Sequence, residues 1–450
     1  MGTTESLAQW IVATSYADIP AAAYEQAKKS ILDFLGTAIQ GSTTELGRMI
    51  ADFTEEQGGT PQARVIATKI RTAAASAAFA NGALGHAEDF DDLGGIGGHP
   101  AIVLTPPALA LAEELHLSGR EVLAAWVVGY EVGTRLSTNL HPDRDWHPTA
   151  IFGAMASAVV ASKLLRLDVQ KTRMALGIAG SQASGLRRNF GTMTKPFHPG
   201  HAARSGVVAA KLAAKGFTAD PDIIEGRQGF ADNFGGAKCN LPAVTKFLGD
   251  LYHLVSEGTR VKPWPCCGGN HQTLTGLLDL LRTHTISPDD VELIEHIGPN
   301  VPCTGALLRD EVHQGLEGKF CLRYNIAAAV IDGKIDLDTF TDKRAGQGDI
   351  QAFMDRVRLT RNPDVILRRP HMADGNPEAR LVVKMRDGRV HDMVLAPAKH
   401  LTGDAVVDKF RANAAYVFDR ERIARPIELV QRLEAVADVG ELMDAVTVAR

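Results

Sequence analysis

The residues best suited to chemistry lie in one stretch, from His86 to Pro100, with the order His-Ala-Glu-Asp-Phe-Asp-Asp-Leu-Gly-Gly-Ile-Gly-Gly-His-Pro. Four carboxylates stand between two histidines, and four glycines follow closely. Neither a core strand nor a helix interior tolerates that density of charge and glycine. A surface linker seldom leads straight into a helix opened by proline. The stretch therefore predicts an ordered loop that brings carboxylates and imidazoles to the start of a helix.

Three titratable residues, His99, His147 and Lys195, each directly precede a proline that is followed by a helical pattern. Proline is common in the first helical turn, and the residue before it is pushed out of the helical region, so each is expected at a helix cap. After Lys195 the helical run is expected from about residue 200. Helix N-termini present unpaired N–H groups and a partial positive charge that attract anions. Any one of these starts is most simply a common helix opener, but three together predict a pocket for an acidic small molecule.

Acid–base chemistry is the activity that these residues can perform. The catalytic candidates are Asp89, His99, His147, Lys195, His271 and Tyr324. Histidine titrates near neutral pH, whereas Lys195 needs a lowered pKa before it can act as a base. Arg187 and Arg188 can lower it, or can clamp a carboxylate at two points. Two alternatives stay open: Tyr324 is a proton donor or a packing residue, and His271 is catalytic or an ordinary loop histidine.

Motifs for other chemistries are absent from the sequence. It contains no phosphate-binding P-loop, no dinucleotide fingerprint, no His-Glu-x-x-His and no Gly-x-Ser-x-Gly. Asp89, Asp91 and Asp92 can in principle hold Mg²⁺, but the helical context supplies no further oxygen ligands. We therefore expect no metal and no cofactor. Asp91 and Asp92 can also cap a helix or form a turn, which is the favoured interpretation of Asp92.

Length and composition limit the class of protein. A chain of 450 residues exceeds the usual size of one core, so two domains are expected. The net charge of −5, from 48 basic and 53 acidic residues, argues against a nucleic-acid partner. No apolar run reaches the ~18 residues of a membrane span, and the N-terminus does not resemble a signal peptide. Five cysteines without paired spacing indicate reduced thiols. We expect a cytoplasmic protein that does not bind membranes.

The pattern of apolar residues divides the chain. Apolar residues recur at three- and four-residue intervals up to about residue 260. The helical segments are 21–40, 69–84, 102–117, 120–137, 149–165 and 201–215. Strand patterns follow at 291–297 and 356–361, and Asp387-Gly388 predicts a type I′ hairpin turn between 379–386 and 389–396. A helical pattern returns after about residue 406.

These patterns predict a mainly α fold of two domains. The expected large all-α helical domain comprises residues 1–261 plus 397–450, and the smaller α+β lid domain, residues 262–396, is inserted into it.

At these residues the chain resembles the MmgE/PrpD family, which includes 2-methylcitrate dehydratase, cis-aconitate decarboxylase and iminodisuccinate epimerase. The matching pieces are His86-Ala-Glu-Asp-Phe-Asp-Asp with His99-Pro100, Trp146-His-Pro-Thr149, Asn189-Phe-Gly-Thr-Met-Thr-Lys-Pro196, Lys262-Pro-Trp-Pro with His271, and Arg323-Tyr-Asn-Ile with Ile331-Asp-Gly333. They occur in family order over most of the chain. Each is weak alone, but together they are specific to the family and not to one member.

The resemblance implies a helical domain with an inserted lid, a homodimer, and an active site between the domains that uses neither nicotinamide nor an iron–sulfur cluster. It also places the family's catalytic positions on the six candidates given above. One position departs from the family pattern. Several decarboxylase and dehydratase members carry a threonine where this chain has Leu93. The lost hydroxyl argues against cis-aconitate and 2-methylcitrate as the specific substrate.

The family's reactions share the breaking or making of a bond at a carbon next to a carboxylate, with an enolate-like intermediate that cations stabilise. The expected substrate is a small di- or tricarboxylate. The predicted substrate-binding residues are Arg187, Arg188, Thr149 and Lys262. One of His99, His147 and Lys195 is expected to move the proton, and His271 or Tyr324 to protonate the leaving group from the lid.

The first prediction of activity is a 2-methylcitrate-dehydratase-like hydro-lyase. The second is an epimerase or racemase of an imino- or amino-dicarboxylate, and the third is a cis-aconitate-type decarboxylase. A catalytically inactive carboxylate-binding dimer is the alternative outside enzymes.

Overall fold

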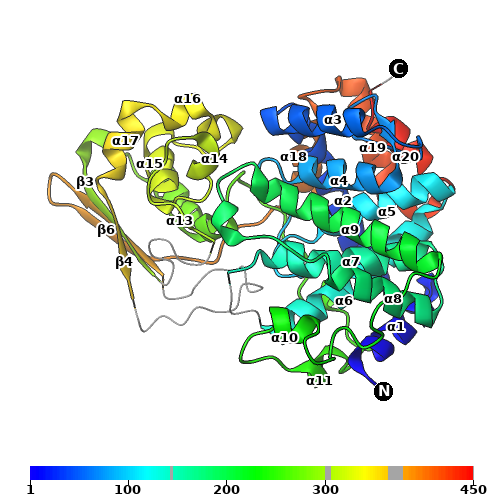
Figure 1. The fold of residues 1–450 in the computed structure, drawn as a ribbon. Helices are drawn as coiled ribbons and strands as arrows, with labels where there is room; N and C mark the ends of the chain where they lie inside the picture. Colours follow the sequence, from blue (N-terminus) through cyan, green and yellow to red (C-terminus); the bar gives the residue numbers. More distant parts are fainter. Residues whose placement is uncertain (142–144, 299–305, 363–378, 449–450) are drawn as a thin grey trace.

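The computed structural model describes residues 1–141, 145–298, 306–362 and 379–448. Figure 1 shows two groups of elements, a large helical group and a smaller group of helices beside a sheet. The long helices of the large group are α1 (Thr3–Ala13), α2 (Ala21–Gly41), α3 (Glu45–Gln57), α4 (Ala74–Gly85), α5 (Ala101–Leu115), α6 (Gly119–Leu140), α7 (Pro148–Leu164), α8 (Val169–Gly180) and α9 (Thr194–Ala214). The short ones are α10 (Phe230–Phe234), α11 (Leu241–Val244) and α12 (His253–Ser256). The C-terminal helices are α18 (Asp404–Ala414), α19 (Arg420–Gln431) and α20 (Gly440–Ala445).

The smaller group contains helices and the main sheet. Its helices are α13 (His271–Thr283), α14 (Gly315–Gly318), α15 (Leu322–Asp332), α16 (Asp342–Ala345) and α17 (Gly348–Met354). Its strands are β3 (Val291–Gly298), β4 (Val357–Arg361), β5 (Arg380–Met385) and β6 (Val390–Val394). A separate two-stranded sheet, β1 (Ala63–Arg64) with β2 (Arg71–Thr72), lies in the large group.

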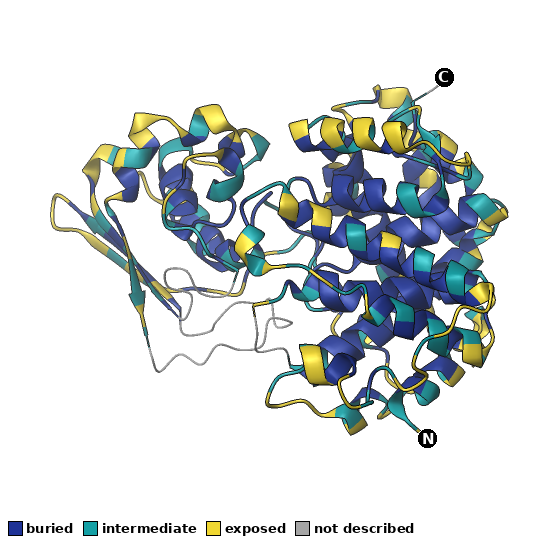
Figure 2. Ribbon diagram, in the orientation of Figure 1, coloured by how far each residue is buried: buried dark blue, intermediate teal, exposed yellow. Residues whose placement is uncertain are grey.

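Buried side chains form two hydrophobic clusters, one in each group. The larger cluster joins residues 7–254 with residues 410–446, so the last three helices pack into the same core as the first nine. The smaller cluster takes in residues 266–395 and one residue of the large group, Phe190. Figure 2 shows the buried interior of both groups in dark blue. The fold is mainly α, as the sequence predicted, while the exact domain boundaries and the role of the smaller group as a lid stay predictions.

All six helical segments predicted from apolar periodicity lie on helices, with ends shifted by a few residues. Two starts differ. The segment from 69 becomes helical only at Ala74, because residues 71–72 form β2. The last begins at Thr194 and not near 200, so Lys195 lies inside the first turn of α9 and not before it. A proline in the first turn gives up an N–H that has no helical partner anyway, which allows Lys195-Pro196 inside the helix.

The sheet has the strand order β4-β3-β5-β6, with β3 parallel to β4 and antiparallel to β5. The predicted hairpin is present, since β5 pairs antiparallel with β6. Its turn is not type I′. That type requires a positive φ at both Asp387 and Gly388, and only Gly388 has one, of 89°. The N–H of Gly388 donates to the carbonyl of Met385, which makes a type I turn closed by a left-handed glycine. This longer loop matches the strand twist without forcing Asp387 into a left-handed conformation.

Within the described parts of the chain, no helix combines the length and the apolar character that crossing a bilayer requires.

Small residues let α9 pack closely against α4 and α7. A Cβ added to Gly200 would lie 2.5 Å from the carbonyl oxygen of Phe79, which is backbone and cannot swing away. The alanine-rich faces of these helices are therefore required by the short distance between them, which only glycine and alanine allow.

We predict that Gly200→Ala lowers the free energy of unfolding by about 1–3 kcal/mol through overpacking, even though alanine favours helix. Urea unfolding followed by circular dichroism measures the change. Gly348→Ala is the matched control, because a Cβ at Gly348 meets no atom within 4 Å. Equal stability of both variants would contradict the close α4–α9 contact.

Candidate active site

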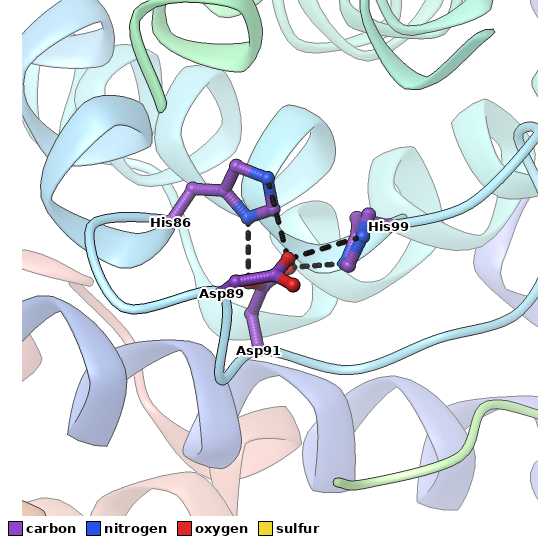
Figure 3. Close-up of side chains that lie close together, drawn as sticks. All are labelled: His86, Asp89, Asp91 and His99. Atoms are coloured by element: carbon purple, nitrogen blue, oxygen red, sulfur yellow. Dashed lines mark hydrogen bonds and ion pairs between the residues drawn. The ribbon is translucent and has the colours of Figure 1, made fainter. Parts of the chain in front are cut away.

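The loop between α4 and α5 carries the carboxylates and imidazoles of the predicted site. His86 ends α4, and His99 precedes the start of α5. Asp89 has a φ of 50°, a left-handed conformation that is costly for a residue with a side chain and is typical of functional sites. Gly94 and Gly97 also have positive φ, which allows the loop to turn back toward α5. Figure 3 shows the result, with two imidazoles and two carboxylates facing one another.

Asp91 binds both imidazoles of the loop. Its Oδ1 lies 2.6 Å from Nδ1 of His86, and its Oδ2 lies 2.9 Å from Nδ1 of His99. Nδ1 of His99 also lies 3.0 Å from the backbone carbonyl of Asp92. Carboxylates and carbonyls only accept hydrogen bonds, so both Nδ1 atoms carry the hydrogen and both Nε2 atoms carry a lone pair in the neutral rings. Burial lowers the pKa of His86 to about 3 and also lowers that of His99, so both rings are neutral at pH 7.

Two ammonium groups converge on Asp89. Nζ of Lys195 lies 2.9 Å and Nζ of Lys262 lies 3.2 Å from the same oxygen, Oδ1. Lys262 also donates to the backbone carbonyl of Asp89 at 2.6 Å, and Lys195 donates to Nε2 of His86. Burial opposes ionisation of Asp89, but the two ammonium groups outweigh it and lower its pKa. The result is two buried ammonium groups that share one oxygen of Asp89, beside two imidazoles of which His86 accepts from Lys195 through Nε2.

Two aromatic rings of the smaller hydrophobic cluster, Phe190 from the large group and Phe320 from the smaller group, enclose Lys195. Its Nζ lies 5.0 Å from the ring centroid of Phe190 and 5.2 Å from that of Phe320. Both positions are within the range of a cation–π interaction. Phe320 belongs to the smaller group, so Lys195 lies where the two groups meet.

His147 and His271 reach the site from helix starts. His147 caps α7, as predicted, and its ring centroid lies 6.3 Å from that of His86. His271 begins α13, and its Nε2 donates to the carbonyl of Cys266 at 3.2 Å. Its Nδ1 is buried and has no hydrogen-bond partner among the described residues. Burial, with a contribution from Lys262, lowers the pKa of His271 to about 3, so the ring is neutral with its Nδ1 lone pair unused.

The structure places the remaining predicted residues less uniformly. Tyr324 is buried in the smaller cluster and its hydroxyl donates to the carbonyl of Thr339 at 2.5 Å, which agrees with its interpretation as a packing residue. Thr149 accepts from the backbone N–H of His99 at 3.3 Å and so holds the loop. Arg187 is half-buried, and its Nε has no hydrogen-bond partner among the described residues, whereas Arg188 is exposed. The roles proposed for these residues stay predictions.

Several residues at the site were not among the sequence candidates. Lys319 of the smaller group contacts the carboxylate of Glu88 at 2.7 Å and the carbonyl of Pro265 at 2.8 Å. Lys409 of α18 contacts Asp33 at 2.7 Å and donates to the carbonyl of Phe90 at 2.6 Å. No local motif marks either lysine, since both reach the loop from distant parts of the chain.

His86 and Asp91 were also missed, although both stand in the motif from which the site was predicted. The spacing of the motif could have suggested an Asp–His pair, but not that one carboxylate serves both imidazoles. Asp92, by contrast, behaves as expected, because its Oδ1 accepts from the backbone N–H of Ala101 at the start of α5.

The cluster also has the composition of a cation site. Ligand atoms of His86, Asp89, Asp91 and His99 all lie within 4.8 Å of one another. These atoms are already engaged, because Lys195 contacts Nε2 of His86 and Oδ1 of Asp89, and the oxygens of Asp91 contact the two Nδ1 atoms. A divalent cation would have to displace the Lys195 ammonium group. The donor set therefore fits a resident metal poorly.

A large helical group and a smaller α+β group that meet over a cluster of buried histidine, lysine and aspartate define the class of protein. The chain belongs to the MmgE/PrpD family, whose N-terminal domain model matches residues 5–240 and whose C-terminal domain model matches residues 264–435. The expectation from the sequence resemblance is confirmed.

Among particular relatives, cis-aconitate decarboxylase of Mus musculus is 27% identical over 98% of this chain and 92% of its own. The cis-aconitate decarboxylase-like protein oryM of Aspergillus oryzae is 29% identical over 98% of this chain and 96% of its own. The 2-methylcitrate dehydratase of Cupriavidus necator is 23% identical over 94% of this chain and 92% of its own. These names describe two kinds of lyase, which supports the expectation of an enzyme of that class.

The neutral buried histidines predict an acid-sensitive fold. The pKa values of His86 and His271 fall to about 3 and that of His198 to about 4, all below the unfolded value. Stability from such groups is fully present above about pH 6.5 and is lost as the pH falls toward the folded-state pKa, because the unfolded chain binds more protons. Each histidine contributes a slope of about 1.4 kcal/mol per pH unit in that window. Asp92, whose pKa is raised by burial, works in the opposite direction.

Urea unfolding between pH 7.5 and pH 4.5 measures this dependence, and we expect the free energy of unfolding to fall steadily below pH 6.5. The variant His271→Gln should show a shallower slope than the unmodified protein. A free energy of unfolding that is constant from pH 7 to pH 5 would contradict the assignment of neutral buried imidazoles.

Proposed function

We propose that the protein is a lyase that acts at the carbon next to a carboxylate of a small tricarboxylate, through an enolate-like intermediate. The observation that carries the proposal is the convergence of Lys195 and Lys262 on Asp89, beside the neutral Nε2 of His99. Cations held in place before the reaction stabilise developing negative charge without the cost of reorganising solvent. The same arrangement attracts the carboxylates of the substrate.

The proton chemistry falls to the imidazoles. Nε2 of His99 carries a lone pair and lies 3.6 Å from Oδ1 of Asp89, and His99 is the most exposed of the loop's buried ionisable groups. In a dehydration, an imidazole of this kind removes a proton from carbon and a protonated group returns it to the leaving hydroxyl. In a decarboxylation, carbon dioxide leaves its bonding electrons on the substrate, and a protonated group delivers a proton to that carbon. His147 and His271 are the further groups available for these transfers.

Decarboxylation of a cis-aconitate-like substrate is the first candidate, because relatives named for that activity match at 27–29% identity over nearly the whole chain. Dehydration of a 2-methylcitrate-like substrate is the second, favoured by the presence of lone-pair imidazoles beside ammonium groups. This order reverses the one expected from sequence motifs alone. Leu93 pairs with Arg260 through the backbone, and its side chain lies against Gly268. A leucine at this position offers an apolar group in place of the threonine hydroxyl. It therefore favours a substrate that has no polar group to bond at that point.

The test is proton NMR of the purified protein in D₂O with cis-aconitate, 2-methylcitrate, citrate, iminodisuccinate and aspartate. Loss of carbon dioxide with a new deuterated position would establish decarboxylation, and loss of water with a new vinylic signal would establish dehydration. Deuterium entry at an α-carbon without elimination would establish an epimerase instead. Turnover of none of these compounds would contradict the proposed activity and favour a carboxylate-binding protein.

We predict that Lys195→Ala lowers turnover by about a hundredfold or more, because it removes a cation from the developing charge. The protein should remain folded, since Lys262 still neutralises Asp89. Steady-state kinetics together with a thermal melt separate the two effects. Lys215→Ala, an exposed position at the end of the same helix, is the control. Loss of stability with unchanged turnover would point to a structural role.

We also predict that EDTA leaves activity unchanged, because the Lys195 ammonium group contacts two of the four potential metal ligands. Turnover is measured before and after dialysis against the chelator, with added Mg²⁺ and Zn²⁺ as a second comparison. Strong inhibition that is reversed by either ion would overturn the metal-free mechanism. A homodimer in the cytoplasm remains part of the proposal.

A further inference from the structure

Two buried histidines meet behind the site through the same ring atom. Nδ1 of His147 lies 3.1 Å from Nδ1 of His198, and both side chains are almost fully buried. His198 stands on α9, one turn after Lys195. A hydrogen bond between two such nitrogens requires a hydrogen on one of them and a lone pair on the other. The hydrogen therefore belongs to the pair, and moving it changes the state of both rings.

This pairing differs from that of His99. Asp91 can only accept, so it fixes His99 in the form with a lone pair on Nε2. His198 can either donate or accept, so Nε2 of His147 can carry a hydrogen in one form and a lone pair in the other. Of the two imidazoles, only His147 has a partner that allows it to act as an acid in one half of a reaction and as a base in the other.

The charges around the two histidines favour placing a positive charge on His198 and not on His147. His147 is packed against His86 and Phe190, and the ammonium group of Lys195 opposes its protonation. His198 is slightly more exposed than His147, and burial, Lys195 and His201 together lower its pKa to about 4, while burial and Lys195 hold the pKa of His147 well below its usual value. His201 follows one turn later on α9 and is half-buried, and it is close enough to His198 to contribute to lowering the pKa of His198.

We propose that His198 is a proton-relay residue that exchanges a proton with Nδ1 of His147 and connects the buried site to solvent past His201. This inference rests on the proposed lyase function. When Nε2 of His147 takes a proton from the substrate, its Nδ1–H bond breaks and a new N–H bond forms at Nδ1 of His198. His147 is then neutral and His198 carries the charge, which it passes to solvent from Nε2. The reverse sequence delivers a proton.

A relay answers a requirement of the first candidate reaction. Decarboxylation replaces a carboxylate by hydrogen and so consumes one proton from solvent in every cycle. The ionisable groups of the site are buried, and Phe190 and Phe320 of the smaller hydrophobic cluster cover Lys195. A pair of histidines leading outward along α9 supplies that proton without opening the site to water.

The test compares His198→Asn with His198→Leu. The asparagine amide can occupy the position of Nδ1 and hydrogen-bond His147, but it cannot carry a proton, whereas leucine does neither. We expect His198→Asn to retain KM for cis-aconitate or 2-methylcitrate within about threefold and to lose about ten- to a hundredfold in kcat. The pH dependence of kcat should also shift in His198→Asn. In a third variant, His198→Ala, added free imidazole should restore part of the lost turnover. His313→Asn, an exposed histidine, is the control.

Full activity of His198→Asn with a large loss in His198→Leu would overturn the relay, because His198 would then only orient His147. Wild-type kcat and pH dependence in both variants would overturn it as well.

A second measurement separates this inference from the proposed function. Nitrogen-15 NMR of histidine-labelled protein, without substrate, reports where the hydrogen of His147 lies. We expect His198→Asn to change the nitrogen shifts and the pH titration of His147 even if no compound in the panel is turned over. An unchanged His147 spectrum in His198→Leu would overturn the inference whatever the activity of the protein.

Discussion

The site depends on a single buried carboxylate, Asp89, placed between two ammonium groups. Removing a charge from water costs several kcal/mol, and that cost is offset only when partners are held in good geometry. Lys195 comes from α9 and Lys262 from the segment that leads into the smaller group, so these ion pairs join three segments that lie far apart in the sequence. The left-handed backbone of Asp89 is tolerated because these contacts determine its position.

The segment that carries Lys262 is itself held on both sides. Arg260 pairs through its backbone with Leu93 of the loop between α4 and α5, and Val261 pairs with Leu401, which leads back to the large group. The two segments in which the chain passes from one group to the other therefore lie beside each other, and beside the loop between α4 and α5. Any change in the relative position of the groups must act directly on Lys262, and through it on Asp89. The predicted closure of the smaller group would therefore act on Asp89 through this short path.

The sequence predicted what depends on local pattern. Helix periodicity, the strands at 291–297 and 356–361, and the hairpin were recovered, because apolar spacing and turn residues act over a few positions. The type of the hairpin turn and the start of α9 were wrong, since Gly388 and Pro196 each permit more than one local geometry. The motif around His86 also predicted the candidate site on the loop where the structure brings two imidazoles and two carboxylates together.

Contacts between distant residues were beyond such reasoning. Nothing in the sequence near Lys409 marks it as the partner of Asp33, and nothing near His198 indicates that it meets His147. The sequence near Tyr324 likewise does not indicate that its hydroxyl donates a hydrogen bond to the carbonyl of Thr339, and its role as a proton donor stays a prediction. Residue type and spacing define which interactions a side chain can make. The packing of the helices decides which neighbour it contacts.

The last three helices complete the hydrophobic cluster of the large group, so that cluster cannot be fully formed until the end of the chain has been synthesised. Lys28 of α2 donates a hydrogen bond to the carbonyl of Gln431, 403 residues further along the chain, and Asp33 forms its ion pair with Lys409. A ribosome that has produced the whole N-terminal half has therefore not yet supplied the residues that neutralise its buried carboxylate. The smaller group, continuous in sequence between Cys266 and Leu395, can bury its cluster while the chain is still emerging. The later segment is thus free to finish folding before the earlier one, and the loop between α4 and α5 is among the last parts to reach its final structure.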